Sequence, residues 1–369
     1  METGKTRRFL QKRANAVILI PESERKPAAE RKAAKVPMDR SETISVIVPV
    51  YNAAAFLPAC VKSLREQTHR SLELIFVDDG STDGSGRLLD SYAKDDPRIR
   101  VIHRTNGGVS AARNDGIDAA TGDYVGFVDA DDTVEPTYCE TLLRAFSEHP
   151  EIGVSVCNRF IHNHPNGRPR GGSEGAGRVL EPGEAIRLAV SIGKSFEGYL
   201  WNKLFSAEIF RETENGRPRF RLDPSVAICE DLLVVVQILA AGNRAYYTDE
   251  PLYHYYYRES SALRTFDEKR MTEFEARARI ESIAASVDEP TLHAAELSHV
   301  KSALNTLAAA KAQRNEPLAA AMKARIDARM KGLLKARDLP KSERMKLLVR
   351  RVVPVLSLRA FNRFAAKPE

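Results

Sequence analysis

Short apolar runs alternate with amphipathic segments through the first third of the chain. Runs rich in β-branched and aromatic residues predict buried strands at "ISVIVPV" (44–50), "LELIFVDDGS" (72–81), "IRVIH" (99–103) and "DYVGFVDADD" (123–132). Helical spacing of apolar residues predicts helices at "FLPACVKSLREQ" (56–67), "RLLDSYA" (87–93) and "GVSAARNDGIDAA" (108–120). Pro58 is expected in the first turn of its helix. The alternation predicts βαβ units and a parallel sheet with right-handed crossovers.

The pattern loosens after residue 150. Strands are expected at "IGVSVCNRF" (152–160) and "RAYYTDEPLYHYYYR" (244–258). Helices are expected at "GEAIRLAVSI" (183–192), "WNKLFSAEIF" (201–210) and "CEDLLVVVQILAAG" (229–242), the last closed by Gly242. The Gly/Pro-rich segment 162–178 predicts a loop, in which His162 and His164 are expected to bind no metal. From about residue 267 onward, Ala, Glu, Arg and Lys predict helices.

Polar clusters follow three of the predicted strands, at Pro49–Asn52, Asp78–Asp79 and Asp129–Asp132. Ligands of α/β sheets bind beyond the carboxyl ends of the strands, so these clusters are expected to converge on one rim. The third cluster holds three aspartates, which repel one another unless a positive group binds between them. Two interpretations remain open: a divalent cation site, or a solvated acidic turn with an Asp capping the helix at "EPTYCETLLRAF" (135–146).

Composition restricts the class of protein. Of 369 residues, 43% are hydrophobic and 29% are charged, as in soluble globular proteins. No apolar run is long enough to span a membrane, and "AVILI" near the N-terminus is too short for a signal-peptide core. The four cysteines are far apart and include no C-x-x-C pair, which indicates buried free thiols in a reducing compartment.

Charge is distributed unevenly along the chain. Residues 1–42 carry net +5 and residues 331–369 carry net +8, so 43–330 carry −7 of the total of +6. An acidic body with basic ends argues against a nucleic-acid partner. It suits a soluble domain whose ends contact an anionic surface such as a membrane, although ordinary solubilising charge is the alternative. The tail "RMKLLVRRVVPVLSLRAFNRF" (344–364) mixes basic and bulky apolar residues in the way interfacial helices do.

Six motifs occur in one order: "SVIVPVYN", "FVDDGSTDGS", "NGGVSAARNDGI", "FVDADD", "WNKLF" and "EDLL". Together they resemble glycosyltransferase family 2, the inverting, nucleotide-sugar-dependent enzymes of the GT-A fold. The resemblance implies a Rossmann-like, nucleotide-binding mixed α/β sheet flanked by helices, at 43–265. A donor-binding half (43–132) would precede an acceptor half (133–265). Residues 1–42 would then form a flexible basic arm, and 266–369 a helical extension with the basic amphipathic tail.

The resemblance implies roles for the strand-end aspartates. Asp131 would ligate a divalent cation, Mn²⁺ or Mg²⁺, which stabilises a departing diphosphate as a Lewis acid. Asp129 would contact the ribose of the donor or the metal, and Asp132 would order the following turn or helix start. Asp79 would bind the pyrimidine base, whereas Asp78 would act structurally.

Further donor-binding residues are implied in two loops. Pro49, Tyr51 and Asn52 match the loop around the nucleoside, with core packing as the alternative for Tyr51. Arg113 lies in the helix after "NGG", whose start is a ready anion site. It either reaches the diphosphate or is a solvated surface residue. His254 lies where some relatives supply a metal-ligating histidine, although a structural histidine is the commoner finding in an aromatic strand.

The acceptor hydroxyl needs a base to remove its proton. By resemblance this base is Asp231, with helix N-capping as the structural alternative. Glu230 would be a structural or acceptor-side neighbour. Trp201, Asn202 and Lys203 match a segment that lines the acceptor side, with core packing as the alternative for Trp201.

The sequence therefore predicts a metal-dependent inverting glycosyltransferase. It would move a sugar from a nucleoside-diphosphate donor, UDP-linked, to a hydroxyl of a glycan or lipid-linked oligosaccharide in bacterial surface polysaccharide synthesis. The expected location is the cytoplasm, peripheral on the inner face of the plasma membrane. The alternatives are a nucleotidyltransferase and a non-catalytic domain that binds a glycan or a partner. The loop "YNAAAFLPA" lacks the Gly-rich basic character usual in nucleotidyltransferases, and neither acidic motif is lost.

Overall fold

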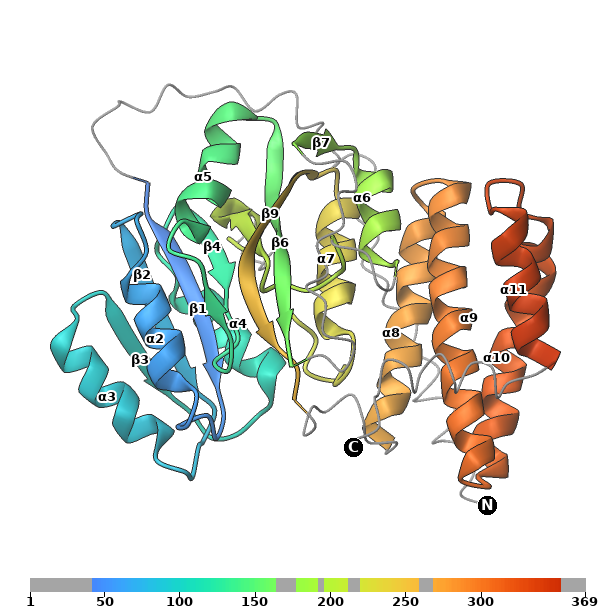
Figure 1. Ribbon diagram of the computed structural model, residues 1–369, viewed down its shortest axis with the longest axis horizontal. Helices are drawn as coiled ribbons and strands as arrows, with labels where there is room; N and C mark the ends of the chain where they lie inside the picture. The colour runs from blue at the N-terminus through green and yellow to red at the C-terminus, as the bar shows by residue number, and fades with distance from the viewer. Residues whose placement is uncertain (1–41, 164–176, 192–195, 212–219, 259–267, 353–369) are drawn as a thin grey trace, which may run out of the picture.

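The computed structural model describes residues 42–163, 177–191, 196–211, 220–258 and 268–352. Within these ranges one nine-stranded sheet forms the α/β part, and four helices stand beside it (Figure 1). The strands are β1 (Ile44–Val50), β2 (Leu72–Asp78), β3 (Ile99–His103), β4 (Tyr124–Phe127), β5 (Thr133–Val134), β6 (Ile152–His162), β7 (Arg178–Leu180), β8 (Lys203–Ser206) and β9 (Arg244–Tyr256). The order is β3-β2-β1-β4-β8-β6-β9-β5, with β7 paired to β9.

Six described α-helices precede the helical extension. They are α2 (Leu57–Arg65), α3 (Ser85–Asp95), α4 (Val109–Ala119), α5 (Tyr138–Glu148), α6 (Pro182–Ala189) and α7 (Glu230–Ala240). The described helices of the extension are α8 (Glu268–Ala285), α9 (Glu289–Ala312), α10 (Glu316–Lys335) and α11 (Lys341–Val352). Pro58 lies in the first turn of α2, as predicted.

The first half of the sheet is the predicted parallel βαβ arrangement. β1 pairs in parallel with β2 and with β4, and β2 pairs in parallel with β3. Beyond β4 the sheet becomes mixed, because β8 lies antiparallel between β4 and β6. The mixed sheet flanked by helices confirms the predicted fold class, and the helical extension follows it as expected.

Alternating side chains of β1 divide the core into two layers. Val46 and Val48 pack on the side covered by α2 and α5, whereas Ile47 packs on the side of α4, α6 and α7. α4 approaches β1 so closely that a Cβ built on Gly116 would lie 2.4 Å from Ile47 Cγ2. Glycine at this position therefore lets α4 lie against the strands whose ends form the site.

Two local predictions are wrong. The segment 201–210 was expected to be helical, but it forms β8 and a short 3₁₀ turn (Ala207–Ile209), because Leu204 and Phe205 face opposite layers of the sheet. His162 is the last residue of β6 rather than part of the loop, while His164 lies outside the described residues. The short strand β5, which pairs with β9, has no periodic signal in the sequence.

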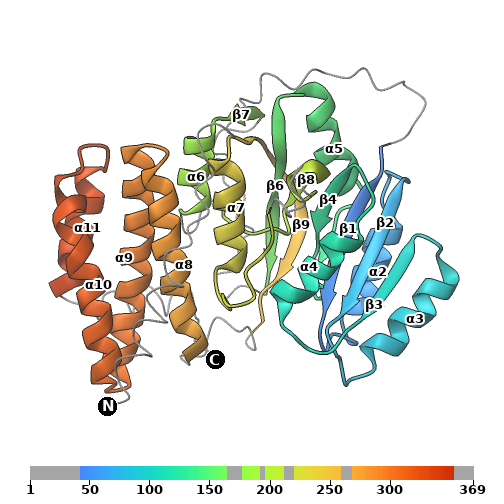
Figure 2. The ribbon, with the colours of Figure 1, turned by 180° about the vertical axis from the view of Figure 1, so that it is seen from behind.

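The helical extension has a core of its own and clear sequence signals for its helix starts. Its core includes Phe274, Leu304 and Met322. The side chains of Asp288 and Asn315 cap α9 and α10 by accepting from backbone amides three residues on, at 2.6 and 3.1 Å. α8 packs against α7 and α9, so the bundle adjoins the α7 side of the sheet (Figure 2).

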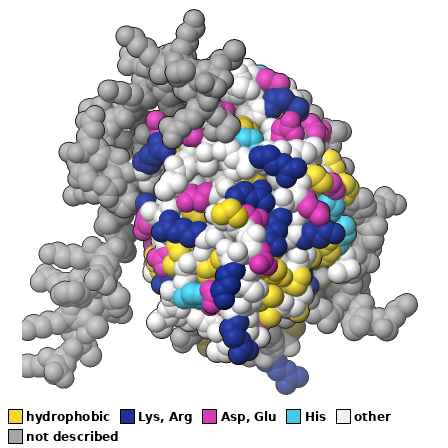
Figure 3. Space-filling view, turned by 90° about the vertical axis from the view of Figure 1, so that its left-hand side faces the viewer, with side chains coloured by type: hydrophobic (Ala, Val, Ile, Leu, Met, Phe, Trp, Pro, Cys, Tyr) yellow, Lys and Arg dark blue, Asp and Glu magenta, His cyan; other side chains and the backbone are white. Residues whose placement is uncertain are grey.

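The cysteines, the apolar content of the helices and the surface charge bear on the expectations drawn from composition. Cys60, Cys139 and Cys157 are buried, Cys229 is half-buried, and all four are free thiols. No described helix is long and apolar enough to cross a membrane. Basic and acidic side chains are intermixed on the face at the α3 end of the molecule (Figure 3). This face is no single basic surface of the kind that nucleic acids select. Residues 1–41 and 353–369, the predicted arm and most of the tail, lie outside the described ranges.

Candidate active site

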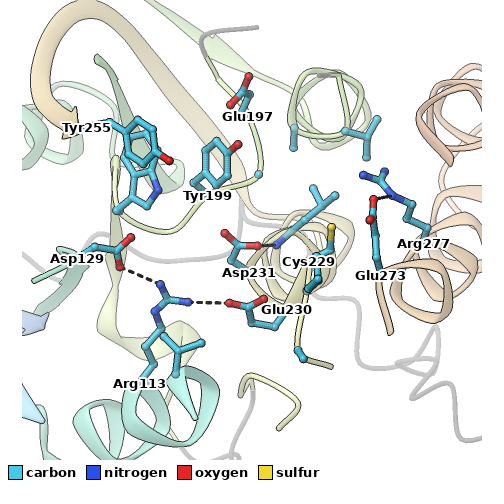
Figure 4. Close-up of a pocket in the computed structure, with 18 of the residues that line it drawn as sticks. Arg113, Asp129, Glu197, Tyr199, Cys229, Glu230, Asp231, Tyr255, Glu273 and Arg277 are labelled. Atoms are coloured by element: carbon cyan, nitrogen blue, oxygen red, sulfur yellow. Dashed lines mark hydrogen bonds and ion pairs between the residues drawn. The ribbon is translucent and has the colours of Figure 1, made fainter. Parts of the chain in front are cut away.

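One cavity of about 560 Å³ collects residues from the end of β4, the start of α7 and the helical extension (Figure 4). Of the predicted site residues it is lined by Arg113, Asp129, Asp131, Trp201, Glu230 and Asp231. Pro49, Tyr51, Asn52, Asp79, Asn202, Lys203 and His254 do not line it. The structure therefore brings the acidic strand end and the acidic helix start together. The predicted rim concerned only the three strand-end clusters, and of these only the cluster at 129–132 lines this cavity.

Arg113 joins these two acidic groups. Its guanidinium donates to Asp129 Oδ1 at 3.0 Å and to Glu230 Oε1 at 3.1 Å (Figure 4). Arg113 is only 5% exposed, so the interpretation as a solvated surface residue is wrong. Burial and the neighbouring Asp231 raise the pKa of Glu230 to about 7, against the opposing effect of Arg113.

Arg258 holds Asp131 in a similar way. Its Nε donates to Asp131 Oδ2 at 2.8 Å, its Nη2 donates to the Asp131 carbonyl at 2.6 Å, and its guanidinium lies 3.7 Å from the ring centre of Phe56. Burial, followed by the charge of Asp129, raises the pKa of Asp131. Sequence reasoning missed Arg258, although it is the last residue of the predicted aromatic strand (244–258).

Asp132 points away from this cavity. It is buried and accepts from the hydroxyl of Tyr253 at 2.8 Å and from the backbone amide of Tyr256 at 2.9 Å. The N-cap of α5 is Thr137, without a side-chain cap bond, so the alternative of an Asp that caps this helix is wrong. Asp132 instead fixes the end of β9 against the acidic turn, which keeps Asp129 and Asp131 directed at the cavity.

Asp231 lies in the first turn of α7, where the N-cap position belongs to Cys229. The N-capping alternative is therefore wrong for Asp231. Cys229 has a φ of +68°, a left-handed conformation that is uncommon outside glycine, and it turns the chain into α7. The Asp231 carboxylate accepts a hydrogen bond from the backbone amide of Leu232 at 2.7 Å and lines the cavity. Burial raises the pKa of Asp231. A half-buried carboxylate with a raised pKa is a suitable proton acceptor.

The predicted nucleoside loop lies beside the cavity and is tied to a second loop. The Asn52 amide donates to Ser81 Oγ at 3.0 Å, and the Asp79 carboxylate accepts from Arg104 and from the amides of Gly107 and Gly108. The ring of Tyr51 is left 55% exposed, so core packing is wrong for this residue.

Asp78 also has internal partners, as the structural interpretation expected. Its carboxylate accepts the amide of Ser81 at 3.0 Å and lies 3.0 Å from His103 Nδ1. Pro49 is an internal residue of β1, where it pairs with Val77. The strand ends thus carry two braced loops, with Tyr51 as the exposed group between them.

Trp201 belongs to an aromatic stack at the cavity wall. Its ring lies 4.9 Å from Tyr199, 4.3 Å from Tyr253 and 5.8 Å from Tyr255, measured between ring centres. Trp201 is almost fully buried and also lines the cavity, so packing and lining roles coincide in one side chain.

Asn202 and Lys203 support the cavity wall from behind. Both are completely buried, and the Lys203 ammonium donates to the carbonyls of Phe196, Glu197 and Tyr199 at 2.7 to 3.1 Å and to Asn202 Oδ1 at 2.8 Å. Burial lowers the pKa of Lys203 to about 7. The four surrounding oxygens oppose this effect, because they accept hydrogen bonds from the ammonium and so favour its charged form. The prediction that these two residues face the acceptor is wrong: they fix the loop whose Glu197 and Tyr199 line the cavity.

His254 takes part in a different contact chain. Its Nε2 lies 2.7 Å from Glu135 Oε1, and its Nδ1 lies 2.8 Å from His162 Nε2. Both ring nitrogens are therefore occupied away from the cavity, which contradicts its suggested role as a metal ligand. Within the part of the chain that is described, no group of three or more His, Cys, Asp and Glu side chains is arranged to hold a metal by itself.

Comparison with known proteins agrees with this geometry. The family model described as glycosyl transferase family 2 matches residues 45–213. Residues 45–213 form a glycosyl transferase family 2 domain. The GT-A fold expected from the sequence motifs is confirmed by a solved structure, Staphylococcus aureus TarS 1–349, with a TM-score of 0.64 and 19% identity over 86% of this chain and 92% of that one.

The family 2 domain also has similar curated proteins. The putative glycosyltransferase EpsH of Bacillus subtilis (strain 168) is 34% identical over 61% of this chain and 64% of its own length. The uncharacterized glycosyltransferase YibD of Escherichia coli (strain K12) is 33% identical over 62% of this chain and 65% of its own length. The chain thus matches somewhat less than two thirds of the length of either relative.

Lys203 gives the first testable prediction. Lys203→Met leaves three carbonyls without their donor, so we expect the free energy of unfolding to fall by about 3 kcal/mol. The loop beside the single tryptophan, Trp201, should loosen, and its fluorescence emission should shift to the red. Lys62→Met is the control, because Lys62 is exposed and pairs with Glu66 at 3.9 Å. Urea unfolding that is equal for both variants would contradict the supporting role.

Proposed function

We propose that the protein is a metal-dependent inverting glycosyltransferase that uses a nucleoside-diphosphate sugar. One observation carries the proposal: a single cavity holds Asp129 and Asp131 at one end and the Glu230–Asp231 pair beside them, linked through Arg113. Sugar transfer needs one group of carboxylates for the donor and a separate one for the acceptor proton. The family match over residues 45–213 supports the same chemistry.

The nucleoside is proposed to bind next to the cavity at the carboxyl ends of β1 and β2. Tyr51 is the exposed ring available for stacking on the base, and Asn52 and Asp79 hold the loops on either side. The Asp79 carboxylate already accepts from the backbone amides of Gly107 and Gly108, so it would bind the pyrimidine base in addition to these two amides. TarS, which has the same fold, was solved with UDP and with UDP-GlcNAc, and this favours a UDP-linked donor here.

The chemistry of the donor set fits a divalent cation at Asp131 and Asp129. Both carboxylates face one cavity, and an arginine now holds each of them, as expected where acidic groups need a positive partner. Mg²⁺ is usually bound by one or two protein carboxylates together with phosphate oxygens, so two carboxylates suffice. When bound, the cation would neutralise the diphosphate as a Lewis acid. Arg258 and Arg113 would then offer N–H donors to the diphosphate oxygens.

Asp231 is proposed as the general base. The acceptor hydroxyl gives its proton to the Asp231 carboxylate while its oxygen bonds to the anomeric carbon. The bond from that carbon to the diphosphate breaks, and the nucleoside diphosphate leaves with the bonding electrons. One displacement of this kind inverts the anomeric configuration. Burial, followed by the charge of Asp129, raises the pKa of Asp231 and so its proton affinity, against the opposing effect of Arg113.

The alternatives have less support. A nucleotidyltransferase would need donors for the phosphates after β1, yet the loop "YNAAAFLPA" supplies neither glycine nor a basic side chain. A non-catalytic binding domain has no need of paired carboxylates with raised pKa values in one cavity, and Glu230 and Asp231 form such a pair. The acceptor, a glycan or a lipid-linked oligosaccharide, is part of the proposal, as is a role in bacterial surface polysaccharide synthesis.

Contact with an anionic membrane is proposed for α11 and the tail that follows it. Met345, Leu348 and Val349 are 60%, 37% and 44% exposed and lie on one helical face, while Leu347 packs into the helical core. Lysines and arginines flank this apolar face, as in "KSERMKLLVRR" (341–351). Such a surface suits the boundary of an anionic leaflet, where the enzyme would share a plane with a lipid-linked acceptor on the cytoplasmic side.

Asp231→Asn tests the base. The amide keeps the shape but cannot take a proton, so transfer should fall by at least about 10²-fold while donor affinity stays near normal. Release of the nucleoside diphosphate measures transfer, and titration calorimetry measures donor affinity. Burial raises the pKa of Asp231, so the carboxylate takes up a proton at a higher pH than an ordinary Asp does. On acidification, wild-type activity should therefore begin to fall at a pH above about 3.9, the usual pKa of Asp. If Glu230→Gln loses activity and Asp231→Asn keeps it, the base is Glu230.

Asp131→Ala tests the cation site. We expect the variant to lose the increase in UDP affinity that Mn²⁺ or Mg²⁺ gives the wild type, because one of two metal ligands is gone. Calorimetry with and without the cation is the measurement. Asp118→Ala is the matched control at the far end of α4, where Asp118 pairs with Arg221. Wild-type affinity that is the same with and without metal would rule out the cation.

The membrane proposal is tested by a triple variant with Met345, Leu348 and Val349 changed to Glu. Its co-sedimentation with vesicles of phosphatidylglycerol and phosphatidylcholine should drop strongly, because the apolar face is lost. The control changes Ala320, Ala324 and Ala328 to Glu, which adds the same charge at exposed positions of α10. Equal sedimentation of the two variants would contradict membrane contact through α11. So would wild-type binding that does not change with salt concentration or with the fraction of anionic lipid.

A further inference from the structure

The cavity extends beyond Asp231 to a region walled by the helical extension. We call it the distal compartment; it is lined by Val190, Ala227, Ile228, Glu273, Arg277 and Ser298. Glu273 and Arg277 come from α8 and Ser298 comes from α9, outside the part that matches the family. Figure 4 shows Arg277 and Glu273 on the opposite side of Cys229 from Asp231. Donor carboxylates lie at the other end, so the distal compartment is the space left for the acceptor.

Arg277 is a fixed polar group in this compartment. It is only 8% exposed, its Nε donates to Glu273 Oε1 at 2.9 Å, and its Nη1 donates to Ser298 Oγ at 2.9 Å. Ser298 in turn donates to the Val190 carbonyl at 2.6 Å, which joins α6, α8 and α9 around the guanidinium. A guanidinium has five N–H donors. Within the described ranges, Nη2 has no hydrogen-bond partner, so Arg277 retains donors for a ligand.

Charge argues against an anionic ligand in the distal compartment. Among the described residues that line the whole cavity, three are arginines and six are carboxylates. The donor diphosphate already adds negative charge at the Asp131 end. Arg277 itself is neutralised by Glu273. Burial opposes the charge of this carboxylate, but the positive charges of Arg277 and Arg270, together with hydrogen bonds, lower its pKa and keep it ionised. A second anion would therefore meet repulsion from most of the lining groups.

The remaining surface suits a neutral sugar ring. Val190, Ala227 and Ile228 offer apolar contacts for C–H groups, while Arg277 donates to hydroxyls and Glu273 and Ser298 accept from them. Resting on the proposed glycosyl transfer, we infer that the distal compartment is the acceptor subsite and binds a neutral sugar unit of the acceptor. Arg277 is then a specificity-determining residue, supplied by the helical extension and not by the family 2 domain.

The test measures binding of simple sugars to the full chain. Saturation-transfer NMR would use methyl glycosides of glucose, galactose, mannose, N-acetylglucosamine and N-acetylgalactosamine. UDP and Mg²⁺, which is not paramagnetic, are present to fill the donor side. Methyl phosphate serves as the anionic probe. UDP binding itself is followed in parallel by titration calorimetry without any glycoside, which reports on the donor function independently of the acceptor.

Two variants and one control separate binding from stability. Arg277→Met should weaken glycoside binding about tenfold or more, the scale of a charged hydrogen bond. Ala227→Trp should abolish it by filling the space, because Ala227 is exposed at the cavity wall and tolerates a larger side chain. Arg329→Met is the matched control: it removes a guanidinium that pairs with Glu281 elsewhere in the same extension, and binding should be unchanged.

Each outcome decides the inference. Glycoside binding that survives both Arg277→Met and Ala227→Trp would place the acceptor elsewhere. A wild type that binds UDP but none of the glycosides, or that prefers methyl phosphate, would overturn the neutral-sugar assignment alone. A wild type that binds no nucleoside diphosphate would remove the proposed function, and the acceptor assignment with it.

Discussion

The contact between Arg113, Asp129 and Glu230 is the constraint on which the site depends. Its three charged groups come from α4, the end of β4 and the start of α7, and they are largely buried. Burying any one of these charges without the others is strongly unfavourable, and removing one partner of such a group typically costs about 3–5 kcal/mol. The contact therefore fixes the strand end that carries the proposed donor carboxylates against the helix that carries the proposed base. It is accompanied by the close approach of α4 to β1, where a Cβ at position 116 would lie 2.4 Å from Ile47 Cγ2.

The same contact leaves the cavity with more carboxylates than arginines. Burial then raises the pKa of Asp131, Glu230 and Asp231 together, because each charge is destabilised by desolvation and by its neighbours. In the proposed function, a divalent cation would relieve this at the strand end, and proton uptake would relieve it at the helix start. Donor binding and acceptor activation would then be two responses of one electrostatic arrangement.

The parallel half of the fold was predictable because its strands are short apolar runs separated by amphipathic helices. Of the predicted residues that line the cavity, Asp129, Asp131 and Asp231 lie at the end of such an element, whereas Arg113 and Trp201 were found through the motifs that contain them. Asn202 and Lys203 show the limit: a motif identifies positions that matter, but not whether a side chain faces the ligand or holds the backbone behind it. The helix predicted over 201–210 failed for a related reason, since its pattern is shared by a short strand whose partners lie about 50 and 80 residues away in the sequence.

No local sequence pattern could identify Arg258 or Arg277. Arg258 contacts Asp131, more than a hundred residues away in the sequence, and Arg277 matters because it lines the cavity.

The start of α7 shows how the site depends on the helical extension. Cys229 holds a left-handed conformation that is unfavourable for a residue with a side chain, by roughly 1–2 kcal/mol. The preceding residues are held in place by α8: the amides of Ala227 and Ile228 donate to Thr272 Oγ1 at 3.0 and 3.3 Å. The helical extension therefore fixes the turn that directs Glu230 and Asp231 into the cavity, so the proposed catalytic geometry requires residues beyond the family 2 domain itself.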